Sequence, residues 1–588
     1  MASTSSVNDS PTTIPVHKFK SFLKRIEVKS PHHSTPTSSW SNYDVICLPP
    51  SRRTWGHLDF FAFWNVQAFS IATWQTATLI TTLGITVWQA MLCVFVARLI
   101  IAAVALSHGW GGSVWHVGFP IYSRFTFGYR GSYICLIQRI VLCIIWYSTQ
   151  SYTCGILLSV MLSALSPTFH NLKNTIPLHV HLTTKELIGW IIYHIVSLPF
   201  LFIPPEKFNI PFKFITFCAF LAIFGTSIGL LVHIGGLKNL AVLKYARNPR
   251  KSYKKLGWNL IFGVNTVINT FVVGLTNQPD FSRFARKPGV QIWGQSISII
   301  VFSSVVPLMA IMATYANMQA FPISATSSNI WNPPYLIESW IDTDYSPRTR
   351  CAAFFSALGF FISTAGLNII DNGVSGGIDL VAISPRYINI RRGTLIIMLI
   401  SMAIQPWYIL SEAPVFLNVL GSYGCFFGPM IGVFTSEYYL VRKQKLKLSE
   451  LFNGSKDSIY WFWHGFNLRA IISWICGFIP GVTGIASLNS NATSVSKISV
   501  KLFHTPFVLG YLIAFFLNTI LNYFFKPPGI GEIDEYDIFG TFTEKEALKM
   551  GVKPKEEMPD TSPTVEVFSI HEMPNSPEKN LDECTYWQ

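Results

Sequence analysis

The sequence predicts an all-α polytopic membrane protein with about 12 transmembrane helices, each of about 20 apolar residues. Half of the 588 residues are hydrophobic and only 13% are charged, compared with about 25% charged residues in soluble domains. The apolar segments also follow one another closely along the chain. These observations predict one membrane domain rather than several soluble ones.

Each predicted span is an apolar segment long enough to cross a bilayer. The third, from Tyr133 to Leu165, contains Arg139 as its only charge. The connection between Ile396–Leu410 and Ala413–Val433 is very short, so a count of 11 or 13 spans stays open. The predicted starts lie near residues 57, 85, 133, 185, 213, 258, 290, 351, 393, 414, 469 and 505.

Polar tails are predicted on both sides of a transmembrane domain at residues 54–525. Residues 1–53 are rich in Ser, Thr and Pro and lack the apolar core of a signal peptide, so a disordered tail is expected. Residues 526–588 hold 14 of the 30 acidic residues. Basic clusters in alternate loops predict that both tails are cytosolic. Residues 238–255 argue against this topology, because they carry seven basic residues on the side predicted to be outside.

Composition and motifs exclude several functional classes. The net charge of +14 comes from basic residues in loops, so it does not indicate a nucleic-acid partner. The ten cysteines are scattered singly, and no metal-ligand spacing, nucleophile motif or phosphate loop is present. We therefore expect neither an enzyme nor a cofactor. A channel would need rings of pore-lining residues, and none is evident in the sequence. A transport-dead nutrient sensor would have an enlarged tail, whereas both tails here are modest.

The third predicted span carries the polar stretch Trp146-Tyr147-Ser148-Thr149-Gln150. Trp146 and Gln150 are four residues apart and therefore share one helical face. An indole offers a stacking surface, and an amide both donates and accepts hydrogen bonds. This pair at membrane depth indicates a binding site for a flat, polar, uncharged ring, and the predicted partners are a small heterocyclic substrate and the lipid bilayer.

The sixth span contains a predicted interruption. Gly274 and Pro279 bracket Leu275-Thr276-Asn277-Gln278, and transporters bind substrate beside such interrupted helices. The alternative is an ordinary helix end before a cytosolic loop.

Several short blocks of sequence carry a resemblance to a known family. They occur in one order from about residue 50 to residue 547, and this shared order is more specific than any single block. On these blocks the chain resembles the fungal permeases of nucleobase-cation-symport family 1, and is most similar to the yeast branch of uracil, allantoin, uridine, thiamine and nicotinamide riboside permeases. The blocks are Arg53-Thr54-Trp55, Gly118-Phe119-Pro120, Trp146-Tyr147…Gln150, Pro279-Asp280-Phe281-Ser282-Arg283-Phe284, Ser384-Pro385-Arg386-Tyr387 and Gly540-Thr541-Phe542-Thr543.

The resemblance implies a secondary active transporter in the plasma membrane. It implies a core of two inverted five-helix repeats followed by two extra C-terminal helices. Substrate would lie between helices 1, 3, 6 and 8. Span 1 has neither Gly nor Pro in its middle, so its interruption is implied by the resemblance alone.

Five substrate-binding residues are implied by matching the family's motifs to this sequence. Trp146 and Phe271 match the two aromatic residues that stack on substrate. Gln150 and Asn372 match the amides of helices 3 and 8. Ser70 matches the substrate-facing position of helix 1.

Two further residues are candidates for the coupling ion. Gly366 and Leu367 stand where bacterial relatives have sodium-binding hydroxyl residues, so proton coupling is favoured over sodium. Gln67 stands where many uracil and uridine relatives carry an acid, and Asp371 is an acid where relatives have a small residue. A carboxylate at membrane depth is a functional hypothesis by default. One hypothesis is that Asp371 has replaced the missing acid of helix 1 as the proton carrier; the alternatives are that it pairs with a basic or hydroxyl neighbour, or that it lies closer to water.

The markers of substrate identity point in two directions. Trp146, Gln150 and Asn372 resemble the carriers of uracil, allantoin and uridine. Ser70 and the Thr276-Asn277-Gln278 run look more like the carriers of thiamine and nicotinamide riboside. A neutral nucleobase, nucleoside or ureide is favoured, and a cationic vitamin is the alternative.

Overall fold

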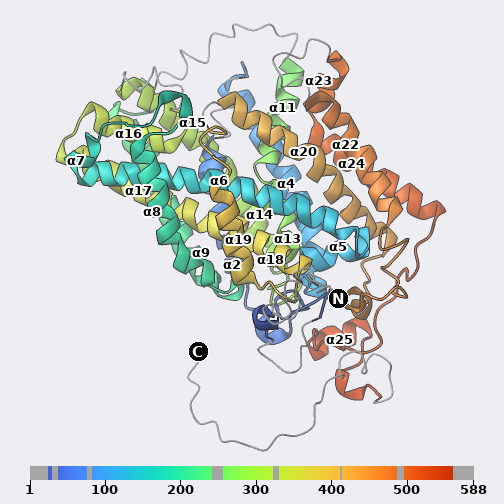
Figure 1. Ribbon diagram of the computed structural model, residues 1–588. Helices are drawn as coiled ribbons and strands as arrows, with labels where there is room; N and C mark the ends of the chain where they lie inside the picture. Colours follow the sequence, from blue (N-terminus) through green and yellow to red (C-terminus); the bar gives the residue numbers. More distant parts are fainter. Residues whose placement is uncertain are drawn as a thin grey trace, which may run out of the picture.

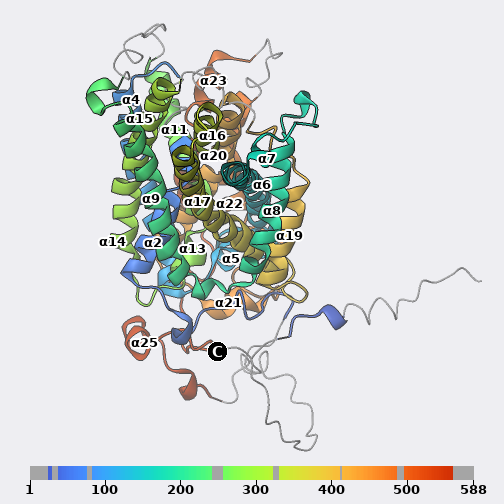
Figure 2. The ribbon, with the colours of Figure 1, turned by 90° about the vertical axis from the view of Figure 1, so that its left-hand side faces the viewer.

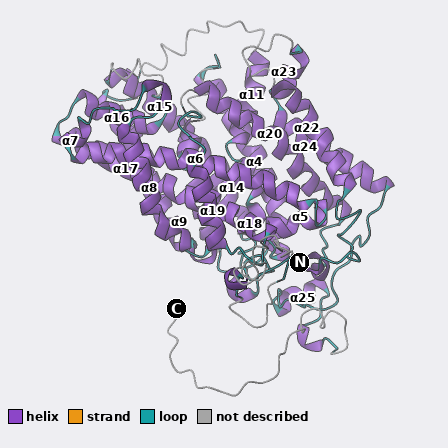
Figure 3. Ribbon diagram, in the orientation of Figure 1, coloured by secondary structure: helices purple, strands orange, loops and turns teal. Residues whose placement is uncertain are grey.

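The computed structural model describes residues 24–29, 38–75, 83–240, 256–321, 330–410, 413–485 and 495–559. Within these ranges the chain forms helices and loops without a named strand (Figures 1 and 3). In both ribbon views α25 (Glu544–Met550) lies at one end of the helical bundle and α23 (Lys497–Phe503) at the other (Figures 1 and 2). The predicted all-α class is confirmed.

Every predicted span starts within four residues of the start of a helix. Eight segments are long and apolar enough to cross a membrane. The segments that begin at α2, α11, α19 and α20 are not among them, so the count of about twelve spans stays a prediction. The twelve helices are α2 (His57–Ala68), α4 (Val87–Trp115), α6 (Ser132–Leu165), α8 (Thr184–Ser197), α9 (Asn209–His233), α11 (Leu256–Asn269), α14 (Gln291–Ile297), α17 (Pro347–Leu367), α19 (Ile390–Met402), α20 (Ala413–Ser436), α22 (Leu468–Ile485) and α24 (Pro506–Phe524).

Further helices continue or connect these segments. They are α5 (Phe119–Phe127), α7 (Pro167–His170), α12 (Val272–Thr276), α13 (Gln278–Ser282), α15 (Ser303–Ala320), α16 (Pro333–Thr343), α18 (Ser375–Ile383) and α21 (Leu448–Asn453). Two π-helical segments, η7 (Ser298–Phe302) and η9 (Asn368–Val374), lie inside longer helices.

The helices pack in two groups. One group contains α2, α4, α11 to α13, and α14 with α15, and the other contains α6, α8, α17 with α18, and α19. Helix α9 packs against both α2 and α17, and α20, α22 and α24 pack on one another. The two groups meet where α12 contacts α6 and η9, and where α2 contacts α17.

The first span is interrupted, as the resemblance implied. Helix α2 ends at Ala68, a turn occupies Phe69 and Ser70, and the chain is helical again over residues 71–75. Ser70 Oγ accepts a hydrogen bond from the backbone N–H of Thr73 at 3.2 Å, which is the bond that a helix N-cap makes. A serine cap thus starts the second half-helix where the sequence has neither Gly nor Pro.

The interruption of the sixth span was placed in part wrongly. Its turns lie at Thr270–Phe271, between α11 and α12, and at Asn277, between α12 and α13. Gly274 lies inside α12, and a Cβ atom there would meet Gln67 Oε1 at 2.3 Å. Gly274 therefore permits close approach between two spans rather than ending a helix, because it lacks a side chain.

Part of the predicted N-terminal tail packs against the membrane domain and the C-terminal tail. Asn42 Nδ2 donates to the Pro385 carbonyl at 2.9 Å, and Arg53 pairs with Glu546 at 2.8 Å. Residues 38–53 thus have a defined conformation, in contrast to the disorder expected for residues 1–53. Residues 24–29 of this tail are also described, and Glu27 among them pairs with Arg386 at 2.6 Å. Residues 1–23 and 30–37 lie outside the described ranges.

Candidate functional site

A small cavity of about 20 Å³ lies between the turn of the first span, α6 and α17. It brings together Ser70, Trp146 and Gln150, three of the predicted site residues. A volume of this size holds about one water molecule. A heterocyclic ring therefore requires the cavity to widen. The other lining residues are Ile71, Ala72, Gln75, Thr149, Thr153, Thr364, Leu367 and Leu410.

Two polar atoms of the cavity lining have no hydrogen-bond partner among the described residues. They are Oε1 of Gln150 and Oγ1 of Thr364, and both are buried. By contrast, Thr153 Oγ1 donates to the Thr149 carbonyl at 3.0 Å. Because a buried polar atom without a partner costs free energy, the Gln150 carbonyl and the Thr364 hydroxyl are suited to bonds with a bound polar group.

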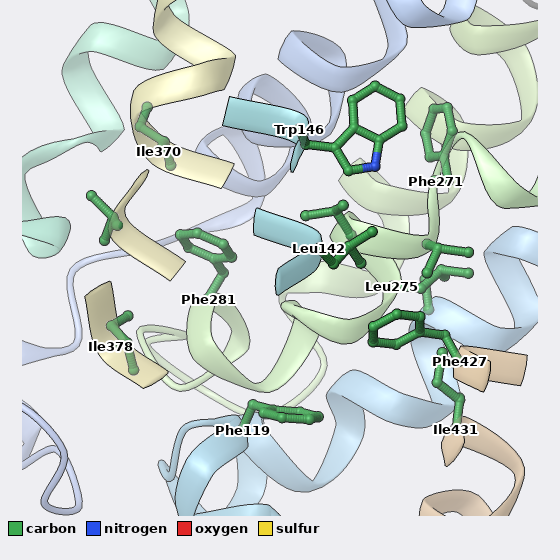
Figure 4. Close-up of a cluster of buried hydrophobic side chains, with 14 of the residues drawn as sticks. Phe119, Leu142, Trp146, Phe271, Leu275, Phe281, Ile370, Ile378, Phe427 and Ile431 are labelled. Atoms are coloured by element: carbon green, nitrogen blue, oxygen red, sulfur yellow. The ribbon is translucent and has the colours of Figure 1, made fainter. Parts of the chain in front are cut away.

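Trp146 and Phe271 belong to one cluster of buried side chains. Figure 4 shows the indole of Trp146 extending from α6 toward the ring of Phe271. Phe271 lies at the turn between α11 and α12 and does not line the cavity. Its ring is parallel to that of Trp64, with centroids 6.2 Å apart, and the Arg98 guanidinium lies 4.1 Å from its centroid. Phe271 is thus already in contact with aromatic and cationic side chains.

Asp371 is buried and hydrogen-bonded to both interrupted spans. Its Oδ2 accepts from the Gln67 side-chain amide of the first span. Its Oδ1 accepts from Asn277 Nδ2 of the sixth span at 2.9 Å, and the same amide donates to the Asp371 carbonyl at 2.8 Å. The structure therefore brings the two predicted coupling-ion residues, Gln67 and Asp371, into direct contact.

Asn372 follows Asp371 in the π-helical segment but does not line the cavity. Its Nδ2 donates to Asn368 Oδ1 at 2.9 Å. Asn368 in turn donates to the Tyr147 carbonyl at 3.1 Å and to the Tyr193 hydroxyl at 3.0 Å. This chain of bonds joins η9 to α6 and α8. In this conformation the side-chain NH2 group of Asn372 therefore already donates a hydrogen bond within the protein.

Arg139 lies in the same part of the core and pairs with two acids. It contacts Asp280 at 2.7 Å and holds Asp379 with two guanidinium nitrogens. All three side chains are fully buried. Phe119 N also donates to Asp280 at 2.9 Å. Arg139 thus neutralises two buried acids of the membrane domain.

Several residues of the site were not singled out from the sequence. Asn277 was named only as part of short runs of residues, although its place between Gly274 and Pro279 was a usable signal. Asn368 precedes Asn372 by one helical turn, the spacing at which side chains on a helix meet. Thr364 carried no signal, because its role depends on the neighbouring helices.

Comparison with known proteins agrees with this arrangement. Residues 47–513 match the family model described as permeases for cytosine/purines, uracil, thiamine and allantoin. The chain is 33% identical to the transporter aclS of Aspergillus oryzae, over 89% of this chain and 93% of that protein. It is 31% identical to the uracil permease of Saccharomyces cerevisiae, over 83% of this chain and 76% of that protein.

A solved structure has the same fold. It is a nucleobase-cation-symport-1 family transporter in a closed conformation with bromovinylhydantoin bound. It aligns with a TM-score of 0.60 and 17% identity, covering 87% of this chain and 99% of that one. On the family match and the relatives of at least 30% identity, the chain belongs to the nucleobase-cation-symport family 1 transporters, the permeases for cytosine/purines, uracil, thiamine and allantoin.

Proposed function

We propose that this transporter imports a neutral nitrogen heterocycle, such as uracil, uridine or allantoin, by proton symport. The single observation that carries the proposal is the cavity beside Trp146, where Gln150 Oε1 has no hydrogen-bond partner among the described residues. An aromatic face next to an unpaired amide acceptor matches a flat ring with an N–H donor on its edge.

The interaction energies are sufficient for selective binding. Stacking of a base on an aromatic side chain contributes about 1–3 kcal/mol. A buried hydrogen-bonding group left without its partner costs about 1–3 kcal/mol. A ring that satisfies both Trp146 and Gln150 is therefore preferred over an apolar ring of the same size.

Alternating access supplies the space that the substrate needs. The cavity of about 20 Å³ is too small for a heterocycle. The two groups of helices touch at the interrupted spans, where Gln67 and Asn277 bond to Asp371. We infer that a shift between the groups changes these contacts and widens the cavity toward one side of the membrane at a time.

Proton coupling is supported by the environment of Asp371. A protonated carboxyl group accepts fewer hydrogen bonds than a carboxylate, so proton uptake weakens the contacts from Gln67 and Asn277. The positions of the bacterial sodium ligands hold Gly366 and Leu367. The Phe69 carbonyl, at the turn of the first span, already accepts a hydrogen bond from Ser363 at 3.0 Å. These features favour a proton over sodium.

A cationic vitamin such as thiamine is the second candidate. Asp371 gives the core a carboxylate that attracts a cation, and Ser70 lines the cavity. The family description also includes thiamine.

For the whole chain we propose a plasma-membrane transporter domain at residues 54–525, with cytosolic tails at 1–53 and 526–588. In support, Arg53 of the N-terminal tail pairs with Glu546 of the C-terminal tail, so the described parts of both tails meet at one end of the bundle.

Uptake of radiolabelled uracil, uridine, allantoin, thiamine and nicotinamide riboside tests the proposal, in cells without carriers of their own and at acid and neutral pH. We expect saturable uptake of a neutral ring that is faster at acid pH. Uptake of thiamine or nicotinamide riboside alone would assign the cationic alternative. Uptake of a neutral ring at equal rates at both pH values would contradict proton coupling.

A further inference from the structure

Arg98 is a buried cation that the proposed transport mechanism does not use. It lies in α4, is fully shielded from solvent, and its Nε, Nη1 and Nη2 atoms have no hydrogen-bond partner among the described residues. Arginine keeps its proton in proteins. The membrane domain therefore contains a permanent positive charge at this point, and such charges mark functional sites by default.

Arg139, another fully buried arginine, shows what is unusual about Arg98. Arg139 is equally buried, but it pairs with the carboxylates of Asp280 and Asp379. Arg98 forms no ion pair with any described residue. Its nearest compensation is the aromatic face of Phe271, 4.1 Å from the guanidinium carbon, where a cation is attracted by the ring quadrupole.

The position of Phe271 connects this charge to the substrate site. Phe271 lies at the turn of the sixth span, and Trp146 extends toward it (Figure 4). Helix α4 packs against both α11 and α12, which flank that turn. If a substrate ring stacks on the face of Phe271 that Arg98 does not cover, the guanidinium lies on the other side of the same aromatic ring, 4.1 Å from its centroid.

We infer that Arg98 determines the charge selectivity of the transporter, by disfavouring cationic rings at Phe271 and favouring neutral or electron-rich ones. This inference rests on the proposed function and refines its substrate class. A ring stacked at about 3.5–4 Å brings a cationic nitrogen to roughly 8 Å from the guanidinium. In a core of low dielectric constant this repulsion lowers affinity by about tenfold or more.

Asp371 does not cancel this effect. Its carboxylate accepts hydrogen bonds from Gln67 and Asn277, so a cationic substrate must replace those bonds to pair with it. Arg98 has no hydrogen bond or ion pair with a described residue that could be exchanged in this way. The net preference at Phe271 is therefore set by Arg98.

Two ribosides, one with a neutral ring and one with a cationic ring, test the inference. Neutral uridine and cationic nicotinamide riboside are compared as substrates of wild type, Arg98→Gln and the charge-preserving control Arg98→Lys, with uptake normalised to protein at the cell surface. We expect wild type and Arg98→Lys to prefer uridine. Arg98→Gln should shift the ratio of kcat/KM values toward nicotinamide riboside by about tenfold.

If all three proteins take up uridine and have the same ratio of kcat/KM values for the two ribosides, the inference is overturned and the proposed function stays intact. Uptake of no heterocycle by wild type would contradict the proposed function and, with it, the role of Arg98. If Arg98→Gln does not reach the membrane, the inference is tested on the wild-type protein alone. Nicotinamide and its cationic N-methyl derivative are then compared as inhibitors, and equal inhibition by both would overturn the inference.

Discussion

The side-chain amide of Asn277 donates to both the carboxylate and the backbone carbonyl of Asp371, at 2.9 and 2.8 Å. This double contact joins the turn of the sixth span to the π-helical segment of the eighth. Single π-helical turns inside α-helices occur frequently at functional sites. Here the π-helical segment holds a carboxylate that both interrupted spans contact through side-chain amides. Movement of either span relative to the eighth therefore changes the hydrogen bonding of Asp371.

Replacing Asp371 by Asn should remove the pH dependence of uptake. The amide does not exchange a proton between pH 5 and 8, so the variant has no carrier for the coupled proton if Asp371 is that carrier. We expect uptake at acid pH to fall to the level at neutral pH, with the protein still at the cell surface. Initial uptake rates from pH 4.5 to 7.5 measure this. The exposed Asp344→Asn variant is the control, and an unchanged pH profile in Asp371→Asn would refute the hypothesis.

Truncating Gln150 to Ala should weaken substrate binding. Loss of the amide leaves the polar edge of the bound ring without its partner, which costs about 1–3 kcal/mol. This corresponds to a rise in KM of about 5- to 150-fold. Gln138→Ala is the matched control, because Gln138 is on the same helix but does not line the cavity. Equal KM values for the two variants would argue against a substrate contact at Gln150.

Replacing Arg139 by Gln should destabilise the fold. The change leaves Asp280 and Asp379 fully buried without their cation, and removing one partner of a buried ion pair costs about 3–5 kcal/mol. The thermal unfolding midpoint of the detergent-solubilised protein measures the effect. The control is Lys553→Gln, which breaks an exposed ion pair with Glu535. We expect Asp379→Asn to restore part of the stability of Arg139→Gln, and a midpoint equal to that of the control would contradict the structure.

Glu338 should make stability depend on pH. Burial raises the pKa of this carboxyl to about 7, although the Lys185 ammonium opposes the rise. Because the pKa in the folded state exceeds the ordinary value of 4.5, the stabilising contribution is complete below pH 4.5 and is lost as pH rises through 7. Glu338→Gln should flatten the dependence of the unfolding midpoint on pH in that window.

Lys185→Gln is the matched variant for Glu338. Its ammonium lies 3.4 Å from the Glu338 carboxylate and lowers the pKa of that carboxyl. Its removal should therefore move the loss of stability to higher pH. The same pH profile in wild type, Glu338→Gln and Lys185→Gln would show that Glu338 does not titrate in this range.

The positions of the spans along the chain were predictable because the hydrophobicity of a segment depends only on its own residues. The predicted spans start close to observed helices since a segment of about 20 apolar residues is readable without its neighbours. Trp146 and Gln150 were placed on one face by helical spacing alone, and both line the cavity. Helix interruptions were less predictable. Gly274 suggested a break in the sixth span, but it instead leaves space for the Gln67 side chain. In the first span, Ser70 caps the second half-helix although neither Gly nor Pro is present there.

The sequence by itself determined the all-α membrane fold, the family and the face of α6 that carries Trp146 and Gln150. Only the tertiary structure decided that Gln67 bonds to Asp371, that Arg139 pairs with two acids, and that Arg98 pairs with none of the described residues. Gln67 and Asp371 are 304 positions apart. Contacts of this kind are set by the packing of helices, so hydrophobic periodicity and residue spacing, which act over a few turns, contain no signal for them.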